Sequence, residues 1–144
     1  ADAHADRGTA YSKLGKYRIA LKDFDRAIQL DPEDPKSWTD RGTTYSRLGE
    51  PNRAISDYDR AIELDPTNAL LYINRGIAYA DKGDLTRAVN DFSVAIDLDP
   101  ESWHAFGQRG SALWELDRQA EAEQDYARAS QIVRAQGRRY WQAI

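Results

Sequence analysis

Apolar side chains recur at spacings of three and four residues along most of the chain, the pattern of α-helices that bury one face. Two kinds of punctuation interrupt it: glycines, which permit tight turns, and Asp-Pro pairs, which end helices. The glycines are Gly15, Gly49 and Gly83, and the Asp-Pro pairs begin at Asp31, Asp65 and Asp99. The pattern therefore predicts helical hairpins. We expect first helices at 2–14, 36–48, 70–82 and 103–115, and second helices at 18–30, 52–64, 86–98 and 119–135.

The hairpins follow a period of 34 residues. The tripeptide Asp-Arg-Gly at 6–8 recurs at 40–42, as Asn-Arg-Gly at 74–76 and as Gln-Arg-Gly at 108–110. Segments 1–34 and 35–68 are identical at 17 of 34 places. Because such units bury their apolar faces only against neighbours, we expect one stacked array with units 1–34, 35–68, 69–102 and 103–136.

Large and small side chains alternate in fixed columns of this repeat, so that rings can fill the gaps left by glycine and alanine. The large columns are His4, Trp38, Tyr72 and Phe106; Tyr11, Tyr45, Tyr79 and Leu113; and Phe24, Tyr58, Phe92 and Tyr126. The small columns are Gly8, Gly42, Gly76 and Gly110; Ala20, Ala54, Ala88 and Ala122; and Ala27, Ala61, Ala95 and Ala129.

This order of aromatic, Gly, Tyr, Ala, aromatic, Ala and Pro resembles the tetratricopeptide repeat (TPR) over residues 1 to about 136. The resemblance implies an all-α, right-handed superhelix of four helical hairpins. The fourth unit departs from the pattern because Leu113 replaces the tyrosine, Asp117 the glycine and Arg134 the proline. We therefore expect a longer second helix there. We interpret 137–144 as a cap, a partial helix from Arg138 in which Tyr140, Trp141 and Ile144 bury the open face of the last hairpin.

Two charged columns are unbroken and admit two interpretations. The arginines are Arg7, Arg41, Arg75 and Arg109, and the aspartates are Asp23, Asp57, Asp91 and Asp125. In the interpretation we favour, each arginine bonds an aspartate across its hairpin or to a neighbour and fixes helix register. In the other, the arginines line a groove and bind anionic ligands.

In proteins that this chain resembles, first helices line a concave face that commonly binds peptides. Carried over, the candidate groove holds a polar column and, three residues later, a second column. These residues are Asp6, Asp40, Asn74 and Gln108, with Thr9, Thr43, Ile77 and Ser111. They are suited to hydrogen-bonding an extended peptide backbone, and the alternative is a merely solvated face.

Apolar residues suggest a pocket in the C-terminal half of the groove. Leu70, Ile73 and Ile77 form a stripe offset from the core positions of their helix, and Trp114 maps to the same side of the fourth unit. Alternatively, Trp114 packs beneath the cap against Tyr140 and Trp141.

Catalytic chemistry is not indicated. The sequence has no Gly-Lys-Ser/Thr phosphate loop, GxGxxG, HExxH or GxSxG motif, and it has no cysteine. We interpret His4 as a core aromatic and His104 as a groove or surface residue, with metal or acid–base work as the alternative. We therefore predict a protein that is not an enzyme and needs no cofactor or metal.

The charge of the chain limits the classes of partner that it can bind. The net charge of −4 disfavours nucleic acid as the main partner, and no apolar run reaches the roughly 18 residues of a membrane helix. We expect a soluble chain without membrane insertion, while cysteine usage leaves both cytoplasmic and periplasmic locations open. The excess of Arg over Lys suggests a bacterial source. Acidic residues at or beside the groove favour a partner with basic and apolar side chains: Asp6, Asp40, Asp81 and Glu115.

One specialisation of the family, a clamp of Lys, Asn, Asn, Lys and Arg for acidic chaperone tails, is not matched. The clamp places hold Ala5, Thr9, Asp40, Leu70 and Asn74, or one unit later Thr39, Thr43, Asn74, His104 and Gln108. The sequence thus predicts a non-catalytic scaffold that binds a protein or peptide segment without that clamp. The alternative is a structural module that forms homo-oligomers through its repeat ends or the aromatic residues near 140.

Overall fold

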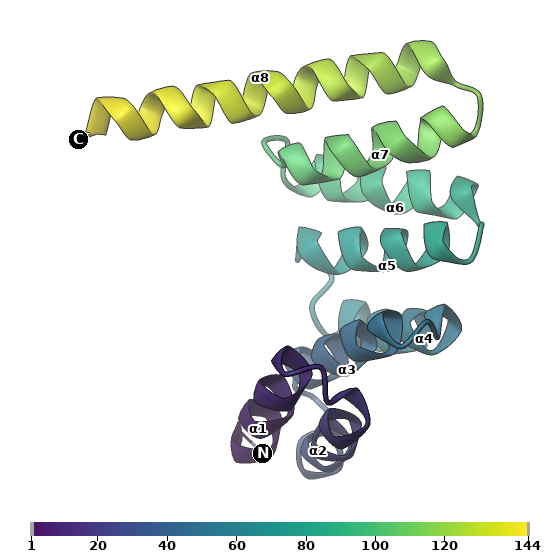
Figure 1. The fold of residues 1–144 in the computed structure, drawn as a ribbon, viewed down its shortest axis with the longest axis vertical. Helices are drawn as coiled ribbons and strands as arrows, with labels where there is room; N and C mark the ends of the chain where they lie inside the picture. Colours follow the sequence, from purple (N-terminus) through teal and green to yellow (C-terminus); the bar gives the residue numbers. More distant parts are fainter. Residues whose placement is uncertain (1, 144) are drawn as a thin grey trace.

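The computed structural model describes residues 2–143, which form eight α-helices (Figure 1). In chain order they are α1 (Asp2–Lys13), α2 (Tyr17–Leu30), α3 (Pro35–Arg47), α4 (Pro51–Leu64), α5 (Ala69–Asp81), α6 (Leu85–Leu98), α7 (Trp103–Glu115) and α8 (Gln119–Ala143). The first seven helices begin and end within one residue of the predicted bounds. No helix in the described range combines the length and apolarity needed to cross a membrane.

Local signals place the helix starts. The side chains of Asp34, Asn68 and Ser102 accept hydrogen bonds from backbone N–H groups in the first turns of α3, α5 and α7. Pro35 and Pro51 occupy the first helical turn, where a missing N–H costs nothing. These caps explain why spacing alone located the boundaries closely.

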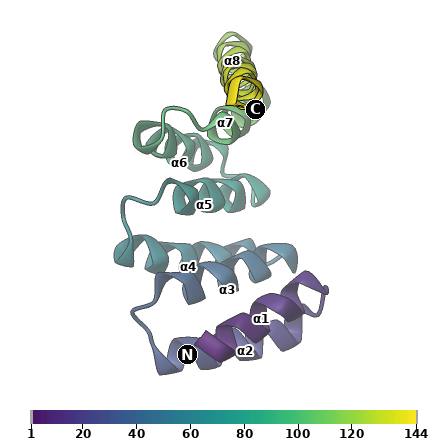
Figure 2. The same cartoon turned by 90° about the vertical axis from the view of Figure 1, so that its left-hand side faces the viewer.

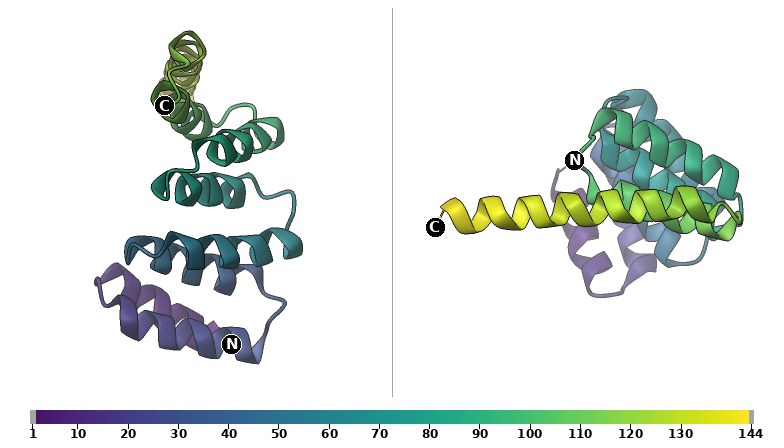
Figure 3. Two further views of the ribbon diagram at one scale, coloured as in Figure 1. Left: turned by 90° about the vertical axis from the view of Figure 1, so that its right-hand side faces the viewer. Right: turned by 90° about the horizontal axis from the view of Figure 1, so that it is seen from above.

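The four hairpins stack in chain order along the long axis of the molecule (Figure 2). The first helices contact one another, α1 with α3, α3 with α5 and α5 with α7. Within residues 2–143 no such contact joins α2 to α4, α4 to α6 or α6 to α8. Since neighbouring elements lie closer on the inside of a curve, the first helices form the concave side. The helix directions turn progressively along the stack, and the fold is the predicted right-handed superhelix (Figure 3, left).

Each hairpin closes around a glycine that lies against an aromatic ring. A Cβ atom placed on Gly8, Gly42, Gly76 or Gly110 would lie 2.6 to 2.9 Å from the nearest ring atom of the large residue sixteen positions later. Those rings are Phe24, Tyr58, Phe92 and Tyr126. The first three are at most 2% exposed, whereas Tyr126, on the last helix, is 38% exposed. The predicted pairing of large and small columns is therefore confirmed.

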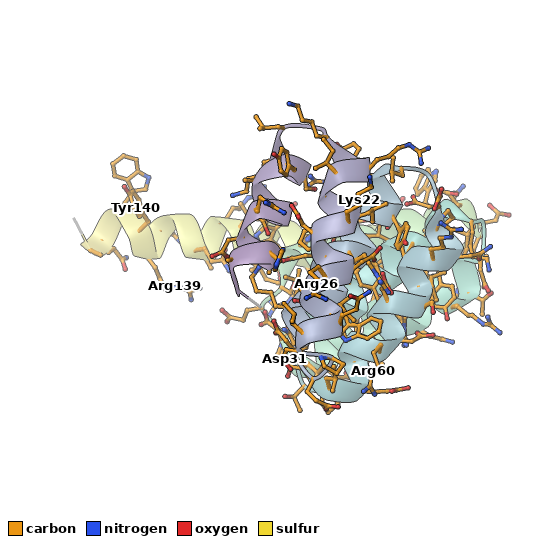
Figure 4. The ribbon with its side chains drawn as sticks, turned by 90° about the horizontal axis from the view of Figure 1, so that it is seen from below. Lys22, Arg26, Asp31, Arg60, Arg139 and Tyr140 are labelled. Carbon is orange, nitrogen blue, oxygen red and sulfur yellow. The ribbon has the colours of Figure 1, made fainter. Side chains whose placement is uncertain are left out.

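The prediction of a separate cap at 138–144 is wrong. Helix α8 runs unbroken to Ala143 and projects past the other helices (Figure 1; Figure 3, right). Tyr140 is 65% and Trp141 75% exposed, so they do not bury the last hairpin, and Tyr140 lies on the projecting part of the helix in Figure 4. Ile144 lies outside the described residues. With Arg134 in place of the unit-ending proline, nothing stops the helix, and the single glycine at 137 is accommodated within it.

Candidate peptide-binding groove

The arginine column fastens each hairpin internally. Arg41 donates from Nε and Nη2 to Asp57 at 2.9 and 2.8 Å. Arg75 bonds Asp91 in the same two-pronged way at 2.8 Å. The other two hairpins repeat this contact through Arg7 with Asp23 and Arg109 with Asp125. Such paired bonds fix both distance and orientation, and therefore the register of the two helices.

The same arginines also join consecutive hairpins. Nη1 of Arg41 donates to Asp25 at 2.8 Å, and Nη1 of Arg75 donates to Asp59 at 2.9 Å. In the last junction Nη1 of Arg109 donates to the Ser93 hydroxyl at 3.1 Å. The structural interpretation of the column is confirmed. For these three residues the geometry favours the structural role over clamps for anionic ligands, because Nε, Nη1 and Nη2 of each arginine already donate to side chains of the array.

Partial burial and neighbouring aromatic rings strengthen the arginine–aspartate pairs. Hydrogen bonding to Asp91 raises the pKa of Arg75 above its ordinary value, so the guanidinium stays charged. Its guanidinium carbon lies 5.7 Å from the ring centre of Tyr72 and 6.0 Å from that of Tyr79. In the second hairpin burial raises the pKa of Asp57 despite the opposing effect of Arg41, so removing the arginine would leave a costly buried carboxylate.

Three hollows lie between the first helices on the concave side. One, between α3 and α5, encloses about 300 Å³ and is lined by Thr43, Ser46, Arg47, Tyr58, Asn74, Ile77 and Asp81. A smaller one, between α1 and α3, encloses about 110 Å³ and is lined by Thr9, Ser12, Lys13, Phe24, Asp40, Thr43 and Arg47. A third, near the N-terminal ends of α3 and α5, encloses about 280 Å³ and is lined by Pro35, Lys36, Thr39, Asp40, Asp65, Asn68, Leu70 and Leu71. None of these residues belongs to α8, so this helix does not fill the hollows.

Half of the predicted site residues line these hollows. They are Thr9, Asp40, Thr43, Leu70, Asn74 and Ile77, and we call the surface that they line the first-helix groove. Outside the three hollows lie Asp6 and Ser111, which are exposed, and His104 and Gln108, which are half-buried and 3.3 Å apart. Their helix α7 extends the concave side beyond the hollows.

The two predicted apolar groove residues Ile73 and Trp114 differ in burial. Ile73 is only 4% exposed and packs in the core cluster that contains Ala105 of the next hairpin, so the prediction that it lines the groove is wrong. The small side chains of α7 leave a space between the helices that the isoleucine fills. Trp114, by contrast, is 48% exposed. The alternative that a cap covers it is also wrong, because α8 projects away and Tyr140 pairs with its neighbour Trp141, at 5.8 Å between ring centres.

Sequence reasoning missed several polar residues of the groove. Ser46 and Arg47 line the largest hollow because they lie one turn after Thr43 on α3. That helical spacing was the available signal. The groove is also less acidic than its composition suggests, since Lys36 donates to Asp40 at 2.6 Å and the bond raises the pKa of Lys36. Asp81 remains at the edge of the largest hollow, and burial raises its pKa.

The groove presents hydrogen-bonding side chains at its surface. In residues 2–143 no three His, Asp or Glu side chains lie close enough together to hold a metal ion. The Asn74 amide lines the largest hollow and has no hydrogen-bond partner among the described residues. Its amide can therefore both donate and accept hydrogen bonds at the surface of this hollow.

Comparison with protein families identifies the repeat. Models described as tetratricopeptide repeat match residues 1–34, 24–56 and 73–138, and one described as TPR repeat matches 42–83. The chain belongs to the tetratricopeptide repeat proteins, whose fold is typical of protein–protein interaction scaffolds. No curated protein sequence matches the chain.

Solved structures agree on the fold. A crystal structure of MamA superposes with a TM-score of 0.90 at 20% identity, covering 95% of this chain and 80% of MamA. MamA from Desulfovibrio magneticus RS-1, residues 41 to the end, gives 0.88 at 22% identity, with 94% and 76% covered. The first TPR of Spaghetti (RPAP3), solved with the HSP90 peptide SRMEEVD, gives 0.77 at 27% identity, with 80% and 91% covered.

Proposed function

We propose that this chain is a non-catalytic scaffold that binds an extended segment of another protein in the first-helix groove. The observation that carries the proposal is the row of hollows between α1, α3 and α5. The Arg75 type of junction holds these helices at fixed spacing, so the groove exists before a partner arrives and little receptor entropy is lost on binding. A similar structure, the first TPR of Spaghetti, was solved with a peptide.

The lining suggests the chemistry of the segment. The Asn74 amide suits backbone hydrogen bonds, while the Thr43 hydroxyl already pairs with the Tyr58 hydroxyl at 3.0 Å and has room for one further bond. Asp81 attracts a basic side chain at the edge of the same hollow. Leu70, which is 53% exposed at the third hollow, and Ile77 in the largest one offer apolar contacts. The segment that fits best is extended and combines apolar with Lys or Arg side chains.

An acidic chaperone tail fits this groove poorly. Of the clamp places, only Asn74 holds the family's residue, and Asp40 would repel a carboxylate. The peptide SRMEEVD, bound by the first TPR of Spaghetti, is therefore the proper negative probe. We expect it to bind no more tightly than a scrambled peptide of the same composition.

The experiment that tests the proposal is selection from a library of extended peptides, followed by mapping of the bound peptide through amide chemical shifts. We expect selected peptides to carry apolar and basic residues and to shift resonances of α1, α3 and α5. Replacing Asn74→Ala should weaken binding about fivefold through one lost side-chain hydrogen-bonding group. Asn90→Ala, an exposed amide on α6, is the matched control. The proposal would be refuted by selected peptides that bind outside the groove, or by peptides whose affinity is unchanged in Asn74→Ala.

A second candidate function is self-association through the end of α8. Tyr140 and Trp141 are mostly exposed on a projecting helix, which is unusual for large aromatic side chains. Sedimentation of the wild type and of the double variant Tyr140→Ser, Trp141→Ser over a concentration series tests it. A wild type that stays monomeric at high concentration would rule it out.

A further inference from the structure

The last residue of every first helix is charged, and the sign of the charge changes halfway along the array. These residues are Lys13 on α1, Arg47 on α3, Asp81 on α5 and Glu115 on α7, at intervals of 34 residues. All four are exposed, and none of them forms an ion pair within residues 2–143. We call these four residues the end-charge column.

The end-charge column borders the first-helix groove. Lys13 and Arg47 line the hollow of about 110 Å³ between α1 and α3, and Arg47 and Asp81 line the hollow of about 300 Å³ between α3 and α5. Glu115 holds the corresponding position on α7, which contacts α5 and extends the concave side. This edge of the groove is therefore positive over α1 and α3 and negative over α5 and α7.

Other acidic side chains of the groove do not cancel this change of sign. Asp40 on α3 accepts a hydrogen bond from Lys36 at 2.6 Å, so its charge is already compensated. Asp6 precedes Lys13 by seven residues, which is about 10 Å along α1. That separation is about one Debye length at physiological salt, so the two charges are largely screened from each other.

Helix stability accounts for only half of the column. The C-terminal end of a helix carries partial negative charge, so Lys13 and Arg47 are favourable there, whereas Asp81 and Glu115 are unfavourable. Burial also raises the pKa of Asp81, which disfavours its charged form further. A cation bound from outside the chain would offset both effects at the two acidic positions.

An exposed aromatic ring lies beside the acidic half of the column. Trp114 directly precedes Glu115 and is 48% exposed. It occupies the position on α7 that Ser12 holds on α1 and Ser46 on α3, and both serines line hollows of the groove. An indole ring next to a carboxylate suits a Lys or Arg side chain, because the ring face attracts cations.

We propose that the end-charge column fixes where the bound segment lies, with two basic residues of the segment over α5 and α7. One contacts Asp81, and the other contacts Glu115 and Trp114. Lys13 and Arg47 repel basic residues and so exclude the placement over α1 and α3. Packed helices lie about 8–10 Å apart and an extended chain advances about 3.3 Å per residue, so the two basic residues are about three positions apart. The inference rests on the proposed function, because the segment must lie in the groove.

Selection from the library of extended peptides tests the composition of the segment. Against the wild type, we expect peptides with two Lys or Arg residues three positions apart. Against the double variant Asp81→Lys, Glu115→Lys, this basic pair should no longer be selected. The peptide SRMEEVD has a single basic residue and cannot supply the pair.

Fluorescence anisotropy of one selected peptide measures the contribution of each side chain. Asp81→Asn and Glu115→Gln should each weaken binding about threefold, and about tenfold together. Trp114→Ala should weaken it about threefold. Glu123→Gln, at an exposed position of α8 outside the groove, is the matched control and should leave affinity unchanged. Asp81→Asn and Glu115→Gln should not lower the melting temperature, because each removes an acid from a helix C-terminus, so weaker binding would not reflect unfolding.

A spin label at either end of the peptide measures its placement. A label at the end nearer the basic pair should broaden amide resonances of α7, and a label at the other end should broaden those of α1. Equal broadening of α1 and α7 by one label would overturn the fixed placement.

The outcomes separate this inference from the proposed function. Groove-binding peptides without the basic pair, or with unchanged affinity in the double variant Asp81→Asn, Glu115→Gln, would overturn the inference and leave the proposed function standing. Failure to select any peptide, or selection only of peptides that bind outside the groove, would overturn both.

Discussion

Arg75 joins three helices through the two sides of its guanidinium group. Nε and Nη2 donate to Asp91 within its own hairpin at 2.8 Å, while Nη1 donates to Asp59 of the preceding hairpin at 2.9 Å. Asp91 is 7% exposed and Asp59 is 50% exposed. The bond to Asp91 is therefore nearly buried and the bond to Asp59 is solvated, so the two should contribute unequally to stability.

Replacing Arg75→Gln should lower the free energy of unfolding by about 2–3 kcal/mol, because the nearly buried carboxylate of Asp91 loses its counter-charge. Replacing Asp59→Ala should cost less than about 1 kcal/mol, since this pair is solvated on one side. Urea unfolding followed by circular dichroism measures both. Equal losses would mean that the buried pair with Asp91 contributes no more to stability than the solvated pair with Asp59.

The contact between Gly76 and Phe92 predicts a steric effect. A Cβ on Gly76 would lie 2.6 Å from Cε1 of a ring that is 1% exposed and has no room to move. We expect Gly76→Ala to destabilise the fold by about 1–3 kcal/mol, despite the better helix propensity of alanine. At Gly110 the opposing ring of Tyr126 is 38% exposed and can shift, so Gly110→Ala should cost less.

The matched control for this effect is Gly107, on the same helix as Gly110. A Cβ there meets no atom within 4 Å, and its backbone is not in the left-handed region. Gly107→Ala should therefore raise stability by about 0.5–1 kcal/mol, the ordinary gain of alanine over glycine in a helix. Thermal unfolding of the three variants side by side separates packing from propensity. A loss at Gly107 would show that propensity arguments fail in this array.

Much of the fold could be predicted because the same local sequence signals recur in several units of the repeat. Caps such as Asp34 and turns such as Gly49 carry local signals, and the Arg75 column pairs with the Asp91 column at a constant separation of sixteen residues. Where the repeat ends, this redundancy ends too. The course of α8 beyond Gly137 depends on whether nearby surface competes for its aromatic side chains, and no internal copy of that junction exists.

The groove was harder to predict than the fold. Thr43 and Asn74 line the largest hollow, on the side for which the resemblance supplied the concave surface and the helical period supplied the face. The position of Ile73 was predicted wrongly, because its burial depends on the size of Ala105 on a different helix, which spacing within α5 does not reveal. Pairing of Lys36 with Asp40 likewise changes the local charge through rotamers rather than through composition.

The turn of the fourth hairpin predicts a stabilising substitution. Asp117 has φ of 60°, whereas the corresponding turns use Gly15, Gly49 and Gly83 at φ of 74° to 86°. A left-handed backbone costs a residue with a side chain roughly 1 kcal/mol that glycine does not pay. Asp117→Gly should raise the melting temperature by a few degrees. Asp84→Gly should instead lower it, because it removes the side chain that accepts the capping hydrogen bond from the backbone N–H of Arg87 at the start of α6.

The end of α8 predicts a deletion with almost no effect on stability. Removing residues 138–144 takes away two exposed rings and one surface ion pair, Arg139 with Glu101 at 3.3 Å, and none of the described residues 138–143 is buried. We expect the free energy of unfolding to change by less than about 1 kcal/mol, since exposed ion pairs contribute little. Truncation after residue 131 is the matched comparison because it also removes Ile132, which is 3% exposed, and it should cost about 2–5 kcal/mol. Denaturant unfolding at two protein concentrations measures both changes. If the short deletion were as costly as the long one, Tyr140 and Trp141 would have to pack against the array in solution, as a cap would.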